Sequence, residues 1–407
     1  MKRILFFILL IYFAFASYGD ARITLERTWT IGGVEGSTID FRGALAVNNT
    51  NQRVMAALTE PEVDYEQDEN GTIWLFYKGQ MEDSEFVIKG TAVVDVNYDT
   101  HILSDSSLPR QELPFTDLTV PDEFISAQAA ELADEQSSLR TIANLVNWIH
   151  GTVEYDVEYW GQTKSAKEVF QLRRGVCVEY THLLISMARS LGFETRYVSG
   201  YVFADTWQPH AWTEIYVPGY GWLPADATFG QVGILDNSHV AIDFGEDQSA
   251  IYDLLLSQYE DATLEVHDKV TPGFLSEESN PALLSLDFDN KTYVVDVTIT
   301  NNRPEYLYGS YSFLVPPDYG ESESSLLLLG PHETVHRYHG LNHSLFEAGY
   351  VYNIPVSASF NDASAEESLR VSVSNNGVAD TQNNGAPSAP CMTAILLLGL
   401  LFSRTII

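Results

Sequence analysis

The chain has 407 residues, a formal net charge of −34, 45% hydrophobic residues and only two cysteines. That length predicts two to three domains, and the hydrophobic content is sufficient for their cores. Because 56 acidic residues outnumber 22 basic ones, the surface would repel phosphate groups, and we expect no nucleic-acid partner. Two cysteines exclude a disulfide-based scaffold and any multi-cysteine metal module.

The beginning of the chain predicts export. Two basic residues precede an apolar run over residues 4–15, and the small residues of 14–16 offer a cleavage site. A short apolar run behind a basic start is typical of a secretory signal peptide, which we assign to residues 1–16. An uncleaved membrane anchor is the alternative, although the run is short for a helix that spans a bilayer.

The end of the chain predicts a membrane anchor. Residues 374–390 are rich in Asn, Gly, Ala, Ser and Pro, and we interpret them as a flexible linker. Residues 391–407 are mostly apolar, about as long as the shortest membrane-spanning helices, and also resemble a C-terminal surface-sorting signal. We therefore expect an exported protein held at the cell surface, with the membrane as a partner through this hydrophobic segment. Four N-glycosylation sequons agree with that side of the membrane: Asn48-Asn49-Thr50, Asn70-Gly71-Thr72, Asn290-Lys291-Thr292 and Asn342-His343-Ser344.

Three blocks of different periodicity lie between the two ends. Residues 21–120 contain short stretches of alternating polarity separated by turn residues, which predicts an N-terminal β-sandwich domain. Residues 262–373 return to this pattern and predict a second, Ig-like β-sandwich domain. The block 121–250 mixes helical and extended patterns, so the predicted fold class is α+β with a core domain flanked by two β-sandwiches. Within residues 21–120, strands are expected at 23–30, 38–47, 72–77 and 86–97.

The helices of the middle block are indicated by their apolar period and their caps. Apolar residues recur at helical spacing over residues 139–149. Ser165 and Glu168 form a capping-box pattern that begins a short helix. A second apolar face covers residues 178–191 and ends at Gly192, a residue that suits a helix C-terminus. Extended segments are expected after it, at 195–203, 211–217 and 222–225.

Cys177 lies where a glycine-containing turn meets the start of this second helix. A helix N-terminus presents free N–H groups and a positive dipole, which favour a thiolate over a thiol. Since the thiolate is the nucleophile, this position suits a reactive cysteine. The alternative is a small buried apolar residue, as most lone cysteines are, and position alone does not decide between the two.

His210 and Asp226 follow on two extended segments joined by a turn over residues 217–221. On adjacent antiparallel strands they share a face only if the numbers of paired residues add to an even value. Direct pairing of His210 with Asp226 would place their Cβ atoms roughly 4.5–5.5 Å apart. Asp226 could then fix the imidazole tautomer while the other ring nitrogen faces Cys177.

Four motifs in this block together resemble the transglutaminase-like superfamily. They are Gly175-Val176-Cys177, the segment 190–201, His210-Ala211-Trp212 and the segment 221–228, in the order and spacing of that family. The resemblance covers about a third of the chain and implies a papain-like Cys-His-Asp site. It implies Cys177 as nucleophile, His210 as base and then acid, and Asp226 as the residue that orients His210. A peptide or carboxamide substrate, with hydrolysis or transglutaminase-type acyl transfer, is the implied chemistry.

Further residues near these motifs leave alternatives open. The backbone N–H of Cys177 is an expected donor to an oxyanion, with Trp160, Gln162 and Gln171 as candidates for a second donor. His182 lies about 140° around the helix from Cys177, and we interpret it as a helix-face histidine rather than the base.

The segment His332-Glu333-Thr334-Val335-His336 matches the H-E-x-x-H pattern of zinc peptidases. That chemistry needs a helix, whereas Gly330-Pro331 and the surrounding alternation predict strand, turn and strand. We therefore expect no metal and no other cofactor. The predicted function is a cell-surface thiol enzyme that acts on a protein or peptide substrate. The alternative is a non-catalytic adhesin or scaffold of the same fold.

Overall fold

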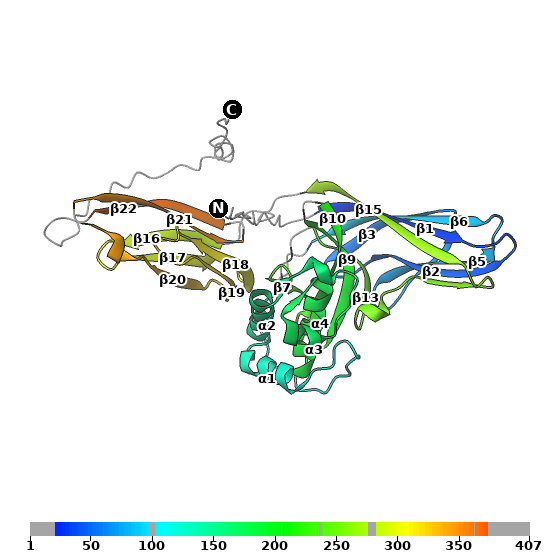
Figure 1. Ribbon diagram of the computed structural model, residues 1–407, viewed down its shortest axis with the longest axis horizontal. Helices are drawn as coiled ribbons and strands as arrows, with labels where there is room; N and C mark the ends of the chain where they lie inside the picture. Colours follow the sequence, from blue (N-terminus) through cyan, green and yellow to red (C-terminus); the bar gives the residue numbers. More distant parts are fainter. Residues whose placement is uncertain are drawn as a thin grey trace, which may run out of the picture.

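The structure is a computed structural model that describes residues 21–97, 102–204, 206–233, 235, 238–275, 282–347, 349–361 and 363–372. Two elongated β-sandwiches lie on either side of a central α+β domain, whose helices project to one side (Figure 1). The expected signal peptide, linker and C-terminal anchor lie outside these described residues. Within the described ranges, no helix combines the length and apolarity needed to cross a membrane.

The N-terminal sandwich consists of two four-stranded sheets, with the orders β15-β1-β6-β3 and β14-β2-β5-β4. Alternate residues of β1 point inward, among them Ile23, Leu25 and Trp29, each at most 1% exposed. The alternating polarity from which the sandwich was predicted therefore corresponds to alternating buried and less buried residues along β1. The strands are β1 (Ala21–Gly32), β2 (Thr38–Val47), β3 (Gln52–Glu60), β4 (Asp64–Gln67), β5 (Thr72–Gln80), β6 (Glu85–Val96), β14 (Leu254–Ser257) and β15 (Thr263–Leu275).

Strand β15 belongs to this first sandwich, although the sequence analysis assigned everything from residue 262 onward to the second one. It pairs with β1 over nearly its whole length, and β14 pairs with β2. Arg27, buried on β1, reinforces the join through Asp253 at 3.5 Å and Asp268 at 2.9 Å. A buried charge without partners is costly, so these carboxylates fix where the returning chain docks. The chain thus leaves the sandwich after β6, forms the central domain and returns.

The central domain packs its helices against a five-stranded antiparallel sheet of order β12-β11-β10-β9-β13 (Figure 1). Helix α4 lies on β9 and β10 and contacts the other three helices. Its apolar residues Leu183, Leu184, Met187 and Ala188 are fully buried, as the helical period predicted. The same holds in α2 for Leu139, Ile142, Leu145, Val146 and Ile149. The elements are α1 (Glu123–Leu132), α2 (Ser138–Thr152), β7 (Glu154–Tyr155), α3 (Ala166–Leu172), β8 (Arg174–Gly175), α4 (Cys177–Ser190), β9 (Thr195–Ala204), β10 (Thr206–Val217), β11 (Gly221–Asp226), β12 (Gln231–Val232) and β13 (Val240–Gly245), with short 3-10 turns at Val157–Tyr159 and Gln248–Ala250.

Gly192 follows α4 and provides a test of how that helix ends. Its φ is +92°, and Phe193 N donates to Ala188 O at 3.1 Å in the pattern of a Schellman turn. A Cβ at this position would also lie 2.8 Å from Pro109 O. We expect Gly192→Ala to reduce the free energy of unfolding by about 1–3 kcal/mol, measured by urea denaturation.

Gly151 near the end of α2 is the matched control for that substitution. A Cβ there meets no atom within 4 Å, and alanine is the better helix former. Gly151→Ala should therefore be neutral or stabilising by up to about 1 kcal/mol. Equal effects of the two substitutions would contradict the role given to Gly192.

The C-terminal sandwich has one sheet of order β16-β17-β20 and one of order β19-β18-β21-β22. Its core is a separate cluster that includes Val297, Tyr311 and Phe360. It contacts the central domain through Tyr308, which is buried among the residues that α2 contributes to the central core. The strands are β16 (Ala282–Asp289), β17 (Val294–Asn301), β18 (Leu307–Leu314), β19 (Glu323–Leu329), β20 (Thr334–Gly340), β21 (Val351–Phe360) and β22 (Ala363–Ser372), with a 3-10 turn at His343–Leu345.

The H-E-x-x-H segment adopts the strand and turn predicted for it. Glu333 N donates to Gly330 O at 3.1 Å, and His332 has a φ of 55°. His336 lies on β20, where its Nδ1 contacts Asp296 at 3.0 Å. The two histidines are therefore not on one helical turn, and this segment does not have the geometry of a helical zinc site.

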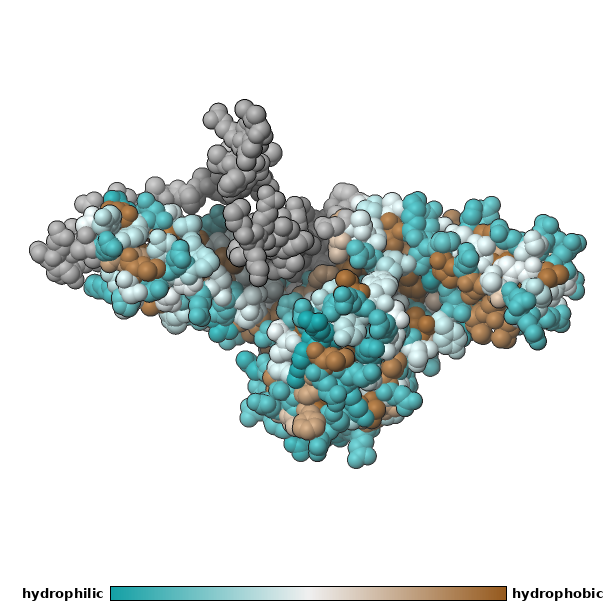
Figure 2. Space-filling view, in the orientation of Figure 1, coloured by the Kyte–Doolittle hydropathy of each residue, from teal (hydrophilic) through white to brown (hydrophobic). Residues whose placement is uncertain are grey.

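The face shown in Figure 2 is mostly hydrophilic over all three domains, with hydrophobic residues in small separate groups. The excess of 56 acidic over 22 basic residues predicts that this surface carries negative charge. Such a surface disfavours contact with a phosphate backbone.

Buried polar contacts join the N-terminal sandwich to β13 at the edge of the central sheet. The side-chain amide of Gln52 donates to Ala241 O and accepts from Ala241 N, both at 2.8 Å. Asp243 accepts from Thr72 Oγ1 at 3.1 Å and from Phe244 N at 2.8 Å. Because these groups are buried, their hydrogen bonds fix the position of β13 against the sandwich.

Asp243 makes the stability of this joint depend on pH. Burial raises the pKa of Asp243 to about 6, although hydrogen bonds from Phe244 and Thr72 oppose the rise. The folded chain therefore binds an extra proton between about pH 4 and 6, and the resulting stabilisation is lost as the pH rises through about 6. We expect Asp243→Asn to raise the free energy of unfolding by about 1–3 kcal/mol at pH 8 and to change it little at pH 4. Urea unfolding at both pH values checks this, and a gain of the same size at both would contradict it.

Candidate active site

Cys177 is the first residue of α4, at the junction where the sequence predicted it. Arg173 ends α3 with a φ of 55°, and β8 then pairs with β7. Val176 is the N-cap of α4 and has an extended backbone. The amide of Cys177 therefore lies in the first helical turn, where N–H groups have no acceptor within the helix.

The buried side chain of Glu179 fixes the backbone turn that precedes Cys177. Its carboxylate is 1% exposed and accepts from Val176 N and Lys164 N, both at 3.0 Å. Burial raises the pKa of Glu179, while these backbone donors oppose the rise. Gly175 is required here because a Cβ would lie 2.4 Å from the Cβ of Glu179. The backbone that leads into Cys177 is thus attached to a buried side chain.

His210 lies on β10 and Asp226 ends β11. The pairing of Thr213 with Ala225 defines a register that keeps both side chains on one face, as the parity argument requires. They are diagonal neighbours, because the observed register differs by two residues from the direct pairing considered in the sequence analysis. Their side chains still meet, because His210 Nε2 donates to Asp226 Oδ2 at 2.7 Å.

Burial and pairing act in opposite directions on this pair, which is 7% and 0% exposed. Burial lowers the pKa of His210, but the Asp226 carboxylate, with a contribution from Cys177, raises it to about 10. Burial likewise raises the pKa of Asp226, but hydrogen bonds and charge from His210 and His239 hold it well below its usual range. The pair is therefore an imidazolium and a carboxylate at neutral pH.

Cys177 lies on the other side of the imidazole. It packs in one cluster with Ala211, the neighbour of His210 in sequence, and it helps to raise the pKa of His210. Since Nε2 of His210 faces Asp226, Nδ1 is the nitrogen that remains for the sulfur. Cys177 is 4% exposed and packs against Ile185 and Tyr197. The structure thus brings the three residues predicted from the sequence close together, with His210 hydrogen-bonded to Asp226 and Cys177 beside them.

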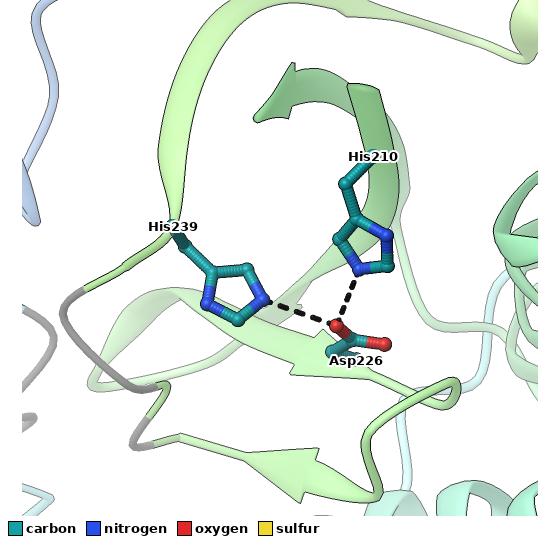
Figure 3. A group of neighbouring side chains, drawn as sticks. All are labelled: His210, Asp226 and His239. Carbon is teal, nitrogen blue, oxygen red and sulfur yellow. Dashed lines mark hydrogen bonds and ion pairs between the residues drawn. The ribbon is translucent and has the colours of Figure 1, made fainter. Parts of the chain in front are cut away.

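His239 is a fourth member of this group that the sequence analysis missed. Its Nε2 lies 3.1 Å from Asp226 Oδ2, the same oxygen that accepts from His210 (Figure 3). The residue is 0% exposed and sits just before β13. No motif surrounds it in the sequence, so only the fold reveals it.

Tyr155 is a second residue that the sequence analysis missed. It lies on β7 beside the turn that leads into Cys177, and its ring is 46% exposed. Burial raises the pKa of Tyr155 to about 12, and the charges of Cys177 and Asp226 add to this. Its hydroxyl is therefore protonated at neutral pH and can donate a hydrogen bond. Of the donors expected from the sequence, the Gln162 amide is bonded to Glu158 O at 2.9 Å, and Trp160 is 53% exposed.

His182 does not belong to the group formed by Cys177, His210 and Asp226. Its Nδ1 lies 3.0 Å from Lys164 O, and its Nε2 accepts from Gln248 N at 3.3 Å. Burial lowers the pKa of His182. The prediction that it is not the base agrees with this placement.

The nitrogen and oxygen atoms of His210, Asp226 and His239 lie within 4.8 Å of one another, close enough to be considered as a metal site. Direct hydrogen bonds of 2.7 and 3.1 Å already join them. Both imidazole nitrogens act as donors there, whereas a metal would require them as lone-pair donors. We therefore interpret the group as a hydrogen-bonded chain.

Residues 126–227 match the description "Transglutaminase-like superfamily". The match contains Cys177, His210 and Asp226 and ends one residue after Asp226. The central domain belongs to the transglutaminase-like superfamily. Its four helices and antiparallel sheet are thus the scaffold of a transglutaminase-like domain, and His239 lies beyond the matched residues.

Other comparisons found one curated protein and several solved structures that are similar to this chain. An uncharacterized protein of Mycobacterium leprae (strain TN) is 24% identical over 136 residues, which cover 31% of this chain and about half (47%) of that relative. A solved structure named "Putative Cysteine Protease" from Cytophaga hutchinsonii is 20% identical and covers 65% of this chain and 96% of that one, with a TM-score of 0.45. Red sea bream transglutaminase is 8% identical over 88% of this chain and 80% of its own, with a TM-score of 0.24.

Proposed function

We propose that the protein is a thiol enzyme that forms an acyl-enzyme at Cys177 from a peptide or carboxamide substrate. The observation that carries this proposal is the buried hydrogen bond between His210 and Asp226 beside Cys177, the first residue of α4. A sulfur beside an imidazolium that a carboxylate stabilises is the arrangement of an activated nucleophile. The membership of the domain in the transglutaminase-like superfamily supports the same chemistry.

In the first step, the sulfur of Cys177 bonds to the substrate carbonyl carbon and the carbonyl oxygen takes up negative charge. We assign two donors to that oxygen: the N–H of Cys177, in the first turn of α4, and the hydroxyl of Tyr155. The C–N bond then breaks as His210 gives its Nδ1 proton to the departing amine. The products of this step are a thioester and a free amine.

In the second step, a water molecule attacks the thioester. His210 accepts a proton from that water, the C–S bond breaks and a carboxylic acid leaves. We favour water over a second amine because water needs no binding site of its own, whereas transglutaminase-type transfer requires a site for the amine. The proposed activity is therefore that of a peptidase or amidase.

The experiment is a trapping assay on the purified protein. The protein is incubated with peptides that carry glutamine carboxamides and with a fluorescent amine, in water enriched in heavy oxygen, and the products are analysed by mass spectrometry. We expect new carboxyl groups that contain heavy oxygen and no amine adduct. An amine adduct would overturn hydrolysis in favour of acyl transfer. Unmodified peptides together with a Cys177 that does not react with iodoacetamide would overturn the enzyme and favour a non-catalytic scaffold.

We also propose that this enzyme works outside the cell, attached to its surface. The apolar run at 4–15 and the linker and apolar segment at 374–407 support this proposal. The sequon residues Asn70 and Asn342 are exposed, as glycosylation would require. Full-length protein that stays in the soluble fraction of cells, inaccessible to added protease, would contradict the proposal.

A further inference from the structure

We propose that His239 is a positioning residue of the same site, which holds the Asp226 carboxylate in the orientation that it needs to orient His210. This inference rests on the proposed function of Cys177. It adds a fourth residue to the group of Cys177, His210 and Asp226 and assigns it a role that neither the sequence motifs nor the family match contains.

Four donors surround the Asp226 carboxylate. Oδ1 accepts from Thr228 N at 2.7 Å and from Phe229 N at 3.1 Å. Oδ2 accepts from His210 Nε2 at 2.7 Å and from His239 Nε2 at 3.1 Å. Since a carboxylate offers about four acceptor positions, these donors fill them and determine its rotation about the Cβ–Cγ bond. Among the described residues, His239 and His210 are the donors that hydrogen-bond Oδ2 itself.

The surroundings of His239 keep its ring in place. Trp212 lies perpendicular to it at 5.2 Å between ring centroids, and Phe229 does so at 6.0 Å. Ala241, two residues further along the chain, is bonded through both its N–H and its C=O to Gln52 of the N-terminal sandwich. The sandwich therefore helps to fix the strand that carries His239, which gives this flanking domain a part in the site.

The consequence for catalysis is electrostatic. The ionisable groups around His210 are Cys177 on α4, Asp226 on β11, His239 before β13 and Tyr155 on β7. The N–H of His239 shares the negative charge of Oδ2 with His210. Without that N–H the whole charge acts on His210, so the imidazolium persists to higher pH, and Oδ2 is no longer held from its second side.

The test follows the alkylation of Cys177 by iodoacetamide across the pH range and needs no substrate. All variants carry Cys391→Ser, because the chain has two cysteines and only Cys177 is then left to react. His239→Leu removes the donor, whereas His239→Gln keeps a side-chain N–H. We expect the alkaline step of the profile, where His210 loses its proton, to move up by at least half a pH unit in His239→Leu and by clearly less in His239→Gln.

Two further variants make the result decisive. His339→Leu replaces a buried histidine that hydrogen-bonds Tyr311 in the C-terminal sandwich, and its profile should match that of the unsubstituted protein. His210→Ala should remove the alkaline step; a profile unaffected by His210→Ala would refute the proposed function itself. A profile that changes with His210→Ala but stays in place, or moves down, in His239→Leu would overturn the role of His239 alone. So would equal shifts in the Leu and Gln variants, since a structural effect of losing the ring would produce them.

Discussion

Cys177→Ala is expected to lower turnover by a factor on the order of 10⁴–10⁶ while leaving the protein folded. The substitution removes the atom that forms the acyl-enzyme, and no other side chain at the site can form that bond. The sulfur is small and is 4% exposed, so its loss should cost about 1 kcal/mol of stability. Steady-state kinetics with the substrate from the trapping assay, together with thermal unfolding, measure both effects.

Ser186→Ala is the matched control for this substitution. Ser186 lies on the same helix α4, is 0% exposed, and its hydroxyl has no hydrogen-bond partner among the described residues. Its truncation should leave both turnover and stability unchanged. Turnover that survives in Cys177→Ala would refute the thiol mechanism, whatever the control shows.

Asp226→Asn is expected to lower turnover by about 10³–10⁴-fold and to change its pH dependence. The substituted amide would keep the shape of the side chain but lose the charge that outweighs burial at His210. The pKa of His210, now about 10, should then fall to its ordinary value of 6.5 or below, because burial would remain. The rate of alkylation of Cys177 across the pH range reports this shift.

The His210–Asp226 pair also predicts how the free energy of unfolding depends on pH. Since the pKa of His210 is about 10 in the folded chain and 6.5 is its ordinary value, the stabilisation is fully present below about pH 6.5 and is lost as the pH rises through about 10. In Asp226→Asn this loss between pH 6.5 and 10 should disappear. Asp243→Asn, the same chemical change at a buried carboxylate of β13, should leave the alkylation profile unchanged. An Asp226→Asn protein with an unchanged profile would show that His210 does not depend on this carboxylate.

Helices α2, α3 and α4 of the central domain could be predicted because their signals are local, whereas α1 was not predicted. The capping box of Ser165 and Glu168 forms as expected and begins α3. The period over residues 139–149 lies inside α2, and Gly192 follows α4 with a positive φ. Each of these signals depends on residues within one or two turns of helix, and a single sequence displays such residues directly.

The pairing of strands could be predicted only in part. The parity rule stated which registers place His210 and Asp226 on one face, because side chains alternate along every strand, and the observed register is one of these. It could not choose between direct and diagonal pairing, since both satisfy the same parity. The position of β15 was missed for a related reason: an alternating segment pairs equally well with many others, and its docking on β1 depends on Arg27 meeting carboxylates far along the chain.

By itself, the sequence determined which residues are the candidates for the site, because the motifs that contain Cys177, His210 and Asp226 resemble those of the transglutaminase-like superfamily and can be read along the chain. Only the tertiary structure decided that His239 joins them and that the N-terminal sandwich supports the strand after His239. The physical reason is that a hydrogen bond between buried side chains depends on distance and direction in space. Those depend on how whole sheets pack, and residues that meet through such packing need carry no common pattern in the sequence.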